Sequence, residues 1–176
     1  SFFSKLFKYP IFNADLTVSN LYKKDKYLFT KIKKKFPDKV SNFPLKKEEL
    51  LKIILQKQKN LNVLGKIIHP IVRKKMQDFL KTHKKRKFVV LDIPLFLENR
   101  LNKKKDIIIF VEADKKKINQ KLKKRKNVNS KLINILRKNQ LPAILKKKKS
   151  TYVIKNNFVR NTAKKNVQLI MEKINK

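Results

Sequence analysis

Residues 88–99 read FVVLDIPLFLEN, and this stretch decides the fold. It opens with four apolar residues of the kind that favours strands, Phe88-Val89-Val90-Leu91. A run without polar alternation is typical of a parallel strand that is covered on both faces. Asp92 ends the run, and Pro94 stops the strand shortly after it. Open α/β sheets bind ligands at the carboxyl ends of their strands, so the sequence predicts chemistry near Asp92.

The rest of the chain alternates between strand and helix patterns. Further strands are predicted over residues 9–12, 107–111 and 152–154, and helices over 1–8, 17–36, 46–58, 60–81, 115–125, 131–139 and 162–176. The pattern is interrupted near His69 and Pro70, where a helix start or a kink is expected, because proline lacks the N–H that a helix interior needs. Asp114 is a predicted N-cap. This alternation predicts an α/β fold with a parallel sheet and right-handed crossovers.

The length and composition favour a single domain. A chain of 176 residues can bury a hydrophobic core. It contains no cysteine, which excludes disulfides and thiolate metal sites. No apolar run approaches the roughly 18–20 residues of a membrane span, and no signal peptide is visible. We therefore expect a cytoplasmic protein that makes no contact with a membrane.

The formal net charge of +37 is the strongest compositional signal. Taken alone, it indicates a nucleic-acid partner. However, the basic residues are almost all lysine, whereas proteins that read nucleic acids favour arginine for bidentate contacts. The chain is also rich in asparagine and has one glycine, as a genome biased toward A and T would produce. Codon bias is therefore the favoured explanation, and nonspecific binding of polyanions is expected in either case.

Several short motifs occur in a fixed order along the chain. Residues 12–15, FNAD, resemble an I-D-A-D motif, and residues 69–73, HPIVR, resemble H-P-x-[IV]-R. Residues 91–99, LDIPLFLEN, resemble [VL]-P-L-L-x-E, and Arg125 matches a basic residue at the start of a lid. Weaker matches are Leu45, Lys47 and Leu50 to L-x-R-x-x-L, residues 139–140 to A-Q, and residues 153–156 to V-I-D-N. In this order the motifs resemble the dephospho-CoA kinase family, which are small P-loop kinases similar to nucleoside-monophosphate kinases.

The resemblance implies a three-layer P-loop kinase-like fold and a reaction. ATP would phosphorylate the ribose 3′-hydroxyl of dephospho-CoA in the last step of coenzyme A biosynthesis, with ATP and Mg²⁺ as cofactors and the two small molecules as partners. The family's single domain has three parts. In this chain its core would comprise about residues 1–16, 84–113 and 150–176, the helical CoA-binding part about 17–83, and the lid about 114–149. A monomer is expected.

The chain departs from the family in its phosphate loop. The motif G-x-x-G-x-G-K-[ST] does not occur in the sequence, whose one glycine is Gly65, and Asn13 replaces the first aspartate of I-D-A-D. We expect that the chain begins shortly after the family's Walker lysine and first strand. Without the loop's N–H groups and lysine, weak ATP binding is expected. The alternatives are an inactive relative, a basic nucleic-acid-binding protein and another small P-loop kinase.

The resemblance also suggests roles for four residues in the first part of the chain. Asp15 would be the catalytic carboxylate that orients or deprotonates the attacking hydroxyl; alternatively, it caps the following helix. Asp92 would lie in the substrate site and could hold Mg²⁺ through water, or it caps its strand. His69 and Arg73 share a helix face and would line the CoA-binding groove, where Arg73 suits a phosphate. A helix N-cap or a core position is the alternative for His69.

Four further candidates lie in the second part of the chain. Glu98 would orient the substrate or a neighbouring basic group; alternatively, it starts a helix. Arg125 and Arg137 would be lid cations that close over the ATP phosphates, although a solvated face is the simpler interpretation. Asn156 is a candidate adenine contact at a strand end. The lysine run 146–149 is interpreted as solvated.

Overall fold

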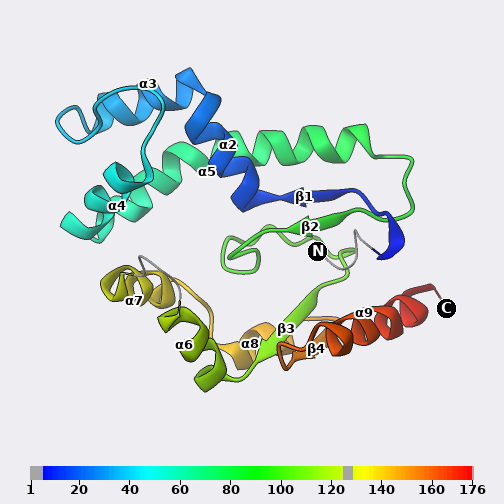
Figure 1. Ribbon diagram of the computed structural model, residues 1–176. Coiled ribbons are helices and arrows are strands. Elements are labelled where there is room, and N and C mark those ends of the chain that lie inside the picture. Colours follow the sequence, from blue (N-terminus) through cyan, green and yellow to red (C-terminus); the bar gives the residue numbers. More distant parts are fainter. Residues whose placement is uncertain (1–5, 125–128, 176) are drawn as a thin grey trace. The chain divides into compact units, whose positions relative to one another are not determined.

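A computed structural model describes residues 6–124 and 129–175 (Figure 1). The described chain divides into two compact units. One unit is Tyr9–Pro94, and the other combines the described residues before Tyr9 with those from Leu95 onward. Within the described residues, no helix is long and apolar enough to cross a membrane.

The first unit contains a pair of parallel strands, β1 (Ile11–Asn13) and β2 (Val90–Asp92). Their register places Asn13 opposite Asp92 at the carboxyl ends of both strands. The Val90 N–H donates to the Pro10 carbonyl at 2.8 Å, which extends the ladder by one bond. The prediction that Asp92 ends a parallel strand is therefore confirmed, although the strand begins two residues later than the apolar run.

Four helices complete this unit: α2 (Ala14–Lys24), α3 (Lys26–Lys35), α4 (Lys47–Gln56) and α5 (Lys59–Thr82). The prediction of one helix over residues 17–36 is wrong, because Asp25 divides it. The Asp25 N–H donates to the Leu21 carbonyl at the end of α2, and its carboxylate accepts from the Leu28 N–H at 2.8 Å to cap α3. A short acidic side chain competes with helical backbone bonds in this way.

The alternative of a helix start at Pro70 is also wrong, because α5 continues through it. Proline costs the helix one hydrogen bond and crowds the carbonyl four residues earlier, that of Lys66. Both Pro70 and Lys66 are exposed, so water can reach the carbonyl that loses its partner. On the opposite face Leu64 and Ile68 are buried, and their packing keeps the helix continuous.

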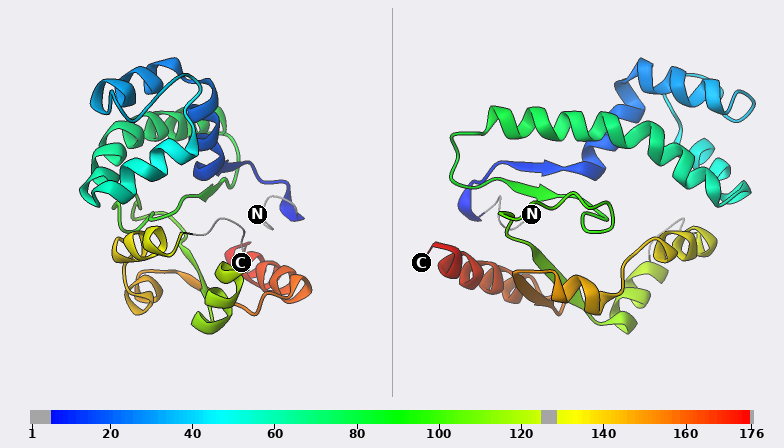
Figure 2. Two further views of the ribbon diagram at one scale, coloured as in Figure 1. Left: turned by 60° about the vertical axis from the view of Figure 1, so that its left-hand side comes forward. Right: turned by 180° about the vertical axis from the view of Figure 1, so that it is seen from behind.

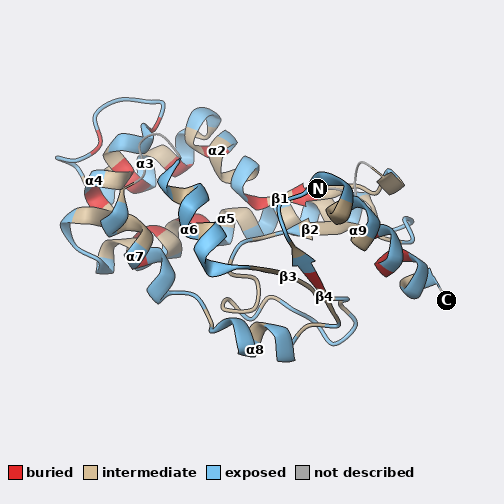
Figure 3. Ribbon diagram, turned by 60° about the horizontal axis from the view of Figure 1, so that its bottom comes forward, coloured by how far each residue is buried: buried red, intermediate tan, exposed pale blue. Residues whose placement is uncertain are grey.

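The core of the first unit lies among these helices, where the buried residues are coloured red in Figure 3. Its fully buried members include Leu28, Ile32 and Ile53, each contributing about 1.5–3 kcal/mol of hydrophobic free energy. The remaining buried members are Leu21, Val40, Leu45, Leu50, Leu64 and Ile68. One end of α5 packs on β1 through the rings of Phe12 and Phe79, whose centroids lie 5.7 Å apart. This packing fixes the strand ends against the helical part.

The second unit contains the parallel strands β3 (Ile109–Ala113) and β4 (Tyr152–Asn156), paired from Ile109 opposite Tyr152 to Ala113 opposite Asn156. The helix α9 (Arg160–Asn175) packs beside β4, as Figure 2 shows, and buries Val167 and Ile170 against Ile154. Its described residues also form α6 (Lys115–Lys123), α7 (Ser130–Lys138) and α8 (Ala143–Lys148). The parallel α/β fold is thus confirmed, with its strands in two pairs.

In the second unit, one helix cap was predicted correctly and one short helix was not predicted. Asp114 caps α6 as predicted, since its carboxylate accepts from the Lys117 N–H at 2.9 Å. The short helix α8 was not predicted, because its sequence after Leu145 is lysine alone and shows no apolar stripe. One of its lysines, Lys146, is largely buried and forms an ion pair.

Candidate functional site

Polar side chains meet at the carboxyl ends of β1 and β2. The Asn13 Nδ2 group donates to Asp92 Oδ2 at 3.2 Å, across the strand pair. The Asn13 Oδ1 atom accepts from the Leu16 N–H at 2.8 Å and so caps α2. One asparagine therefore joins the two strand ends and starts the helix. The alternative that Asp15 caps this helix is wrong, because Asn13 already does so.

The Asp15 side chain takes no part in this capping arrangement. It lies in the first turn of α2, is exposed, and makes no side-chain hydrogen bond or ion pair to any described residue. The helix N-terminus carries partial positive charge, which stabilises an ionised carboxylate there. The structure thus brings Asn13, Asp15 and Asp92 to one edge of the strand pair, with one carboxylate oxygen of Asp92 and both of Asp15 available to a ligand.

His69 and Arg73 lie one helical turn apart on the exposed face of α5. Burial of part of the ring, followed by the positive charge of Arg73, lowers the pKa of His69 below its usual 6.5. The imidazole is therefore neutral at pH 7 and can both donate and accept a hydrogen bond. The alternative of an N-cap is wrong, because His69 lies inside α5.

The chain's one glycine explains where the His69 ring lies. A Cβ atom on Gly65 would lie 3.2 Å from His69 Cε1 and 3.5 Å from Nε2. The imidazole therefore packs directly over the glycine of the preceding helical turn. The sequence carries this signal, since a glycine inside a helical pattern four residues before a histidine leaves room for the ring.

We expect Gly65→Ala to stabilise α5 and yet raise the pKa of His69. Alanine favours a helix interior by roughly 1 kcal/mol over glycine, but its methyl group pushes the ring toward water. NMR titration of the histidine and a thermal melt measure both effects. Asn62→Ala is the control, because Asn62 is an exposed residue of the same helix. Equal His69 pKa values in both variants would contradict the expectation.

A cavity of about 1120 Å³ lies in the second unit at the carboxyl ends of β3 and β4. Two predicted residues line it, Arg137 from α7 and Asn156 from the end of β4. The Arg137 guanidinium donates to the Asn119 side-chain oxygen on α6, and Asn119 lines the cavity too. The Asn156 Oδ1 atom accepts from the Phe158 N–H at 2.8 Å. The NH₂ group of Asn156 has no partner among the described residues. The predicted Arg125 lies outside the described residues.

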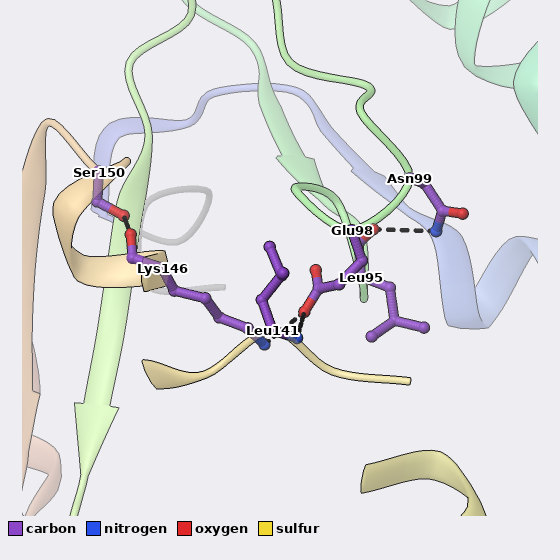
Figure 4. Close-up of polar contacts among 6 residues, drawn as sticks. All are labelled: Leu95, Glu98, Asn99, Leu141, Lys146 and Ser150. Atoms are coloured by element: carbon purple, nitrogen blue, oxygen red, sulfur yellow. Dashed lines mark hydrogen bonds and ion pairs between the residues drawn. The ribbon is translucent and has the colours of Figure 1, made fainter. Parts of the chain in front are cut away.

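Glu98 is held by two groups of one segment (Figure 4). Its Oε1 atom accepts from the Leu141 N–H at 2.9 Å and lies 2.7 Å from Lys146 Nζ. Burial would raise the pKa of Glu98, but the bonds from Lys146 and Leu141 outweigh it and lower the pKa below 4.5. Glu98 therefore contacts a neighbouring basic group, Lys146, and it lies in a turn and not at a helix start.

The interpretation of residues 146–149 as a solvated run is wrong for Lys146, which forms the ion pair with Glu98 and lines the cavity. Lys147 is exposed as expected, and its Nζ atom lies 3.4 Å from the carboxylate of Glu112. Sequence reasoning missed Lys146 because its partner is far away along the chain. The only available signal was the scarcity of acids, 12 against 49 basic residues, which makes each carboxylate a candidate partner.

We expect the Glu98 ion pair to stabilise the fold only above acidic pH. The folded-state pKa is lowered, so this stability is present above the unfolded value of about 4.5 and is lost as the pH falls through the folded value. Wild type should therefore melt higher than Glu98→Gln at pH 7, and the difference should shrink toward pH 3. A difference in melting temperature that stays constant over this range would contradict the expectation.

The described residues contain no cluster of three or more histidines, cysteines or acids that could hold a metal ion. A magnesium ion would therefore rely on few protein ligands. This suits Mg²⁺, which often binds through one or two carboxylates with water and substrate phosphates completing its shell. Asp92 fits such a role, because its carboxylate is exposed and only one of its oxygens bonds to Asn13.

Comparisons with known structures support the fold. A protein titled "Crystal structure of TT1252 from Thermus thermophilus" superposes with a TM-score of 0.73 at 19% identity, covering 96% of this chain and 86% of that one. A dephospho-CoA kinase from Campylobacter jejuni superposes with a TM-score of 0.64 at 19% identity, covering 97% and 87%. These similarities concern the path of the backbone.

Comparisons of sequence identify the family. The model of the family described as "Dephospho-CoA kinase" matches residues 1–161. A dephospho-CoA kinase from Bartonella quintana is 34% identical over 146 residues, covering 82% of this chain and 74% of that protein. Another from Wolbachia pipientis wMel is 31% identical over 167 residues, covering 94% and 85%. The chain belongs to the dephospho-CoA kinase family, whose members are kinases that use ATP.

Proposed function

We propose that the protein transfers the γ-phosphoryl group of ATP to the ribose 3′-hydroxyl of dephospho-CoA. The observation that carries this proposal is the open Asp15 carboxylate beside Asn13 and Asp92, at the carboxyl ends of two parallel strands. Phosphoryl transfer needs little covalent help from a protein. It needs an acceptor hydroxyl held in line and a carboxylate near its proton.

Asp15 is the proposed general base. As the 3′-oxygen bonds to the γ-phosphorus, the bond from that phosphorus to the bridging oxygen of ADP breaks, and the hydroxyl proton passes to the Asp15 carboxylate. Asn13 keeps this carboxylate in place, because it caps the helix whose first turn carries Asp15. Asp92 would bind Mg²⁺ through water, and the ion would supply positive charge to the phosphates.

His69 and Arg73 are proposed to bind the acceptor. Both are exposed on one face of α5, within the helical part 17–83 that we assign to substrate binding. The neutral imidazole of His69 can accept or donate a bond to the acceptor's amide or hydroxyl groups. Arg73 offers a planar fork that suits a phosphate. The described part of residues 114–149 is proposed as lid.

The ATP site is proposed in the cavity at the ends of β3 and β4. Its lining includes Asn156, whose NH₂ group is available to an adenine nitrogen, and Arg137, whose charge suits a phosphate. The volume of about 1120 Å³ lies slightly above the range of about 300–1,000 Å³ that is usual for small-molecule sites, so it can accommodate a nucleotide. We also propose a monomer in the cytoplasm, testable by light scattering and cell fractionation.

A panel of acceptors tests the proposed function. The protein, expressed from its complete gene, is mixed with ATP, Mg²⁺ and either dephospho-CoA, AMP or another nucleoside monophosphate, and the products are separated by chromatography. We expect coenzyme A and ADP in equal amounts, with at least about tenfold lower turnover on the other acceptors, a difference of ~1.4 kcal/mol. Preference for a nucleoside monophosphate, or no transfer with any acceptor, would refute the proposal.

A further inference from the structure

The wall of the cavity in the second unit is tied to a carboxylate that does not line it. The lining includes Leu141, Lys146 and Glu112, but not Glu98. Both groups that Glu98 Oε1 holds, the Leu141 N–H and the Lys146 ammonium, belong to lining residues. Figure 4 shows them converging on this one oxygen. Any effect of Glu98 on the cavity would therefore pass through Leu141 and Lys146.

The two ion pairs of α8 differ in their surroundings. The Glu98 and Lys146 side chains are 11% and 20% exposed and lie 2.7 Å apart. Glu112 and Lys147 are 35% and 51% exposed and lie 3.4 Å apart, as a surface pair does. Exposed pairs hold side chains weakly, because water screens the charges. The partly buried pair thus constrains the Lys146 side chain more strongly than the surface pair constrains Lys147.

The turn that contains Glu98 has a constrained backbone. Leu95 and Arg100, at its two ends, have φ angles of 56° and 51°, in the left-handed region that residues other than glycine rarely adopt. The carbonyl of Leu95 accepts from both the backbone and the side chain of Asn99, each at 2.9 Å. Strained backbone of this kind persists where the surrounding contacts determine it, often at functional sites.

We propose that Lys146 contacts the phosphates of the nucleotide in this cavity and that Glu98 is its positioning residue. This inference rests on the proposed ATP site. A lysine ammonium has three N–H donors, so the one directed at Glu98 leaves two for phosphate oxygens. The carboxylate is not part of the cavity lining, so its charge can orient the ammonium with less repulsion of the anion than a lining carboxylate would cause. The hydrogen bond from the Leu141 N–H to the same carboxylate holds the segment before α8 in place relative to Glu98.

Four variants test this assignment, with ADP binding by calorimetry and the Michaelis constants of the complete gene product as readouts. Lys146→Met removes the charge, and Glu98→Gln keeps the acceptor for the Leu141 N–H but loses the charge that orients Lys146. Lys147→Met is the matched control, since Lys147 is the next residue on the same helix but is absent from the lining. The double variant Glu98→Gln/Lys146→Met measures whether the two act together.

We expect Lys146→Met to weaken ADP binding by about tenfold and Glu98→Gln by about threefold, since charge-assisted bonds to phosphate are strong. The KM for ATP should rise in parallel, and the KM for dephospho-CoA should stay constant, which a general loss of structure would not produce. The double variant should resemble Lys146→Met, because Glu98 acts through Lys146. Lys147→Met should stay within about twofold of wild type.

The outcomes separate this inference from the proposed function. Equal ADP affinity in Lys146→Met and Lys147→Met would overturn the inference, and so would full additivity in the double variant or an absence of ADP binding by wild type. Active phosphorylation of dephospho-CoA with these equal affinities would leave the proposed function standing. Conversely, the expected binding pattern without phosphoryl transfer would support the inference and refute the function. If Glu98→Gln does not fold, the comparison of the two lysine variants decides.

Discussion

Asp15→Asn is expected to lower the kcat of the complete gene product by about 10²–10⁴-fold, the range typical of a lost general base. The amide has nearly the shape of the carboxylate but cannot accept the hydroxyl proton. Because Asp15 makes no side-chain bond to a described residue, the fold should change little. The KM for dephospho-CoA should stay within about threefold, since a base acts mainly in the transition state. Initial rates at saturating ATP measure both constants.

Glu48→Gln is the matched control for this variant. Glu48 is an exposed carboxylate in the first turn of α4, so its loss costs the same favourable interaction with a helix N-terminus, about 0.3–1 kcal/mol. It lies at no strand end, and we expect wild-type turnover. A kcat for Asp15→Asn equal to that of Glu48→Gln would exclude Asp15 as the base and would direct attention to Asp92.

The strand that carries Asp92 could be predicted from sequence because its signal is local. A short apolar run followed by aspartate and proline predicts the strand, its parallel pairing and the residue at which it ends. In the structure the strand ends at Asp92. Asp25 and Pro70 show where local reasoning is weaker. The sequence pattern of apolar residues continues across Asp25, yet its side chain caps a new helix. At Pro70 the reverse holds, because packing of the opposite face outweighs a local helix breaker.

The site could be predicted only where its residues follow strand ends or a family motif. Asp15 and Asp92 are of this kind, and the structure places both near Asn13. The capping and bridging role of Asn13 was missed, because it depends on the register of two strands far apart in sequence. Lys146 was missed for a similar reason. In the sequence Lys146 cannot be distinguished from the neighbouring lysines. Only the fold shows that it pairs with Glu98.

The second large effect is expected at Arg137. Arg137→Ala should lower kcat/KM for ATP by about 10²-fold, because it removes a cation that can donate two parallel bonds to a phosphate from the cavity wall. Arg137→Lys should recover part of this loss, since lysine keeps the charge but lacks the planar fork. Initial rates over a range of ATP concentrations at saturating dephospho-CoA measure these effects.

The bond to Asn119 gives the Arg137 experiment its internal check. Asn119→Ala releases the guanidinium but leaves its charge in the cavity, so we expect a smaller loss than in Arg137→Ala, of about threefold to tenfold. Arg160→Ala removes an exposed arginine of the same unit that does not line the cavity, and it should leave the rate unchanged. If Arg137→Ala matched Arg160→Ala, Arg137 would be a surface cation, because a residue that binds phosphate cannot be removed without loss of transition-state stabilisation.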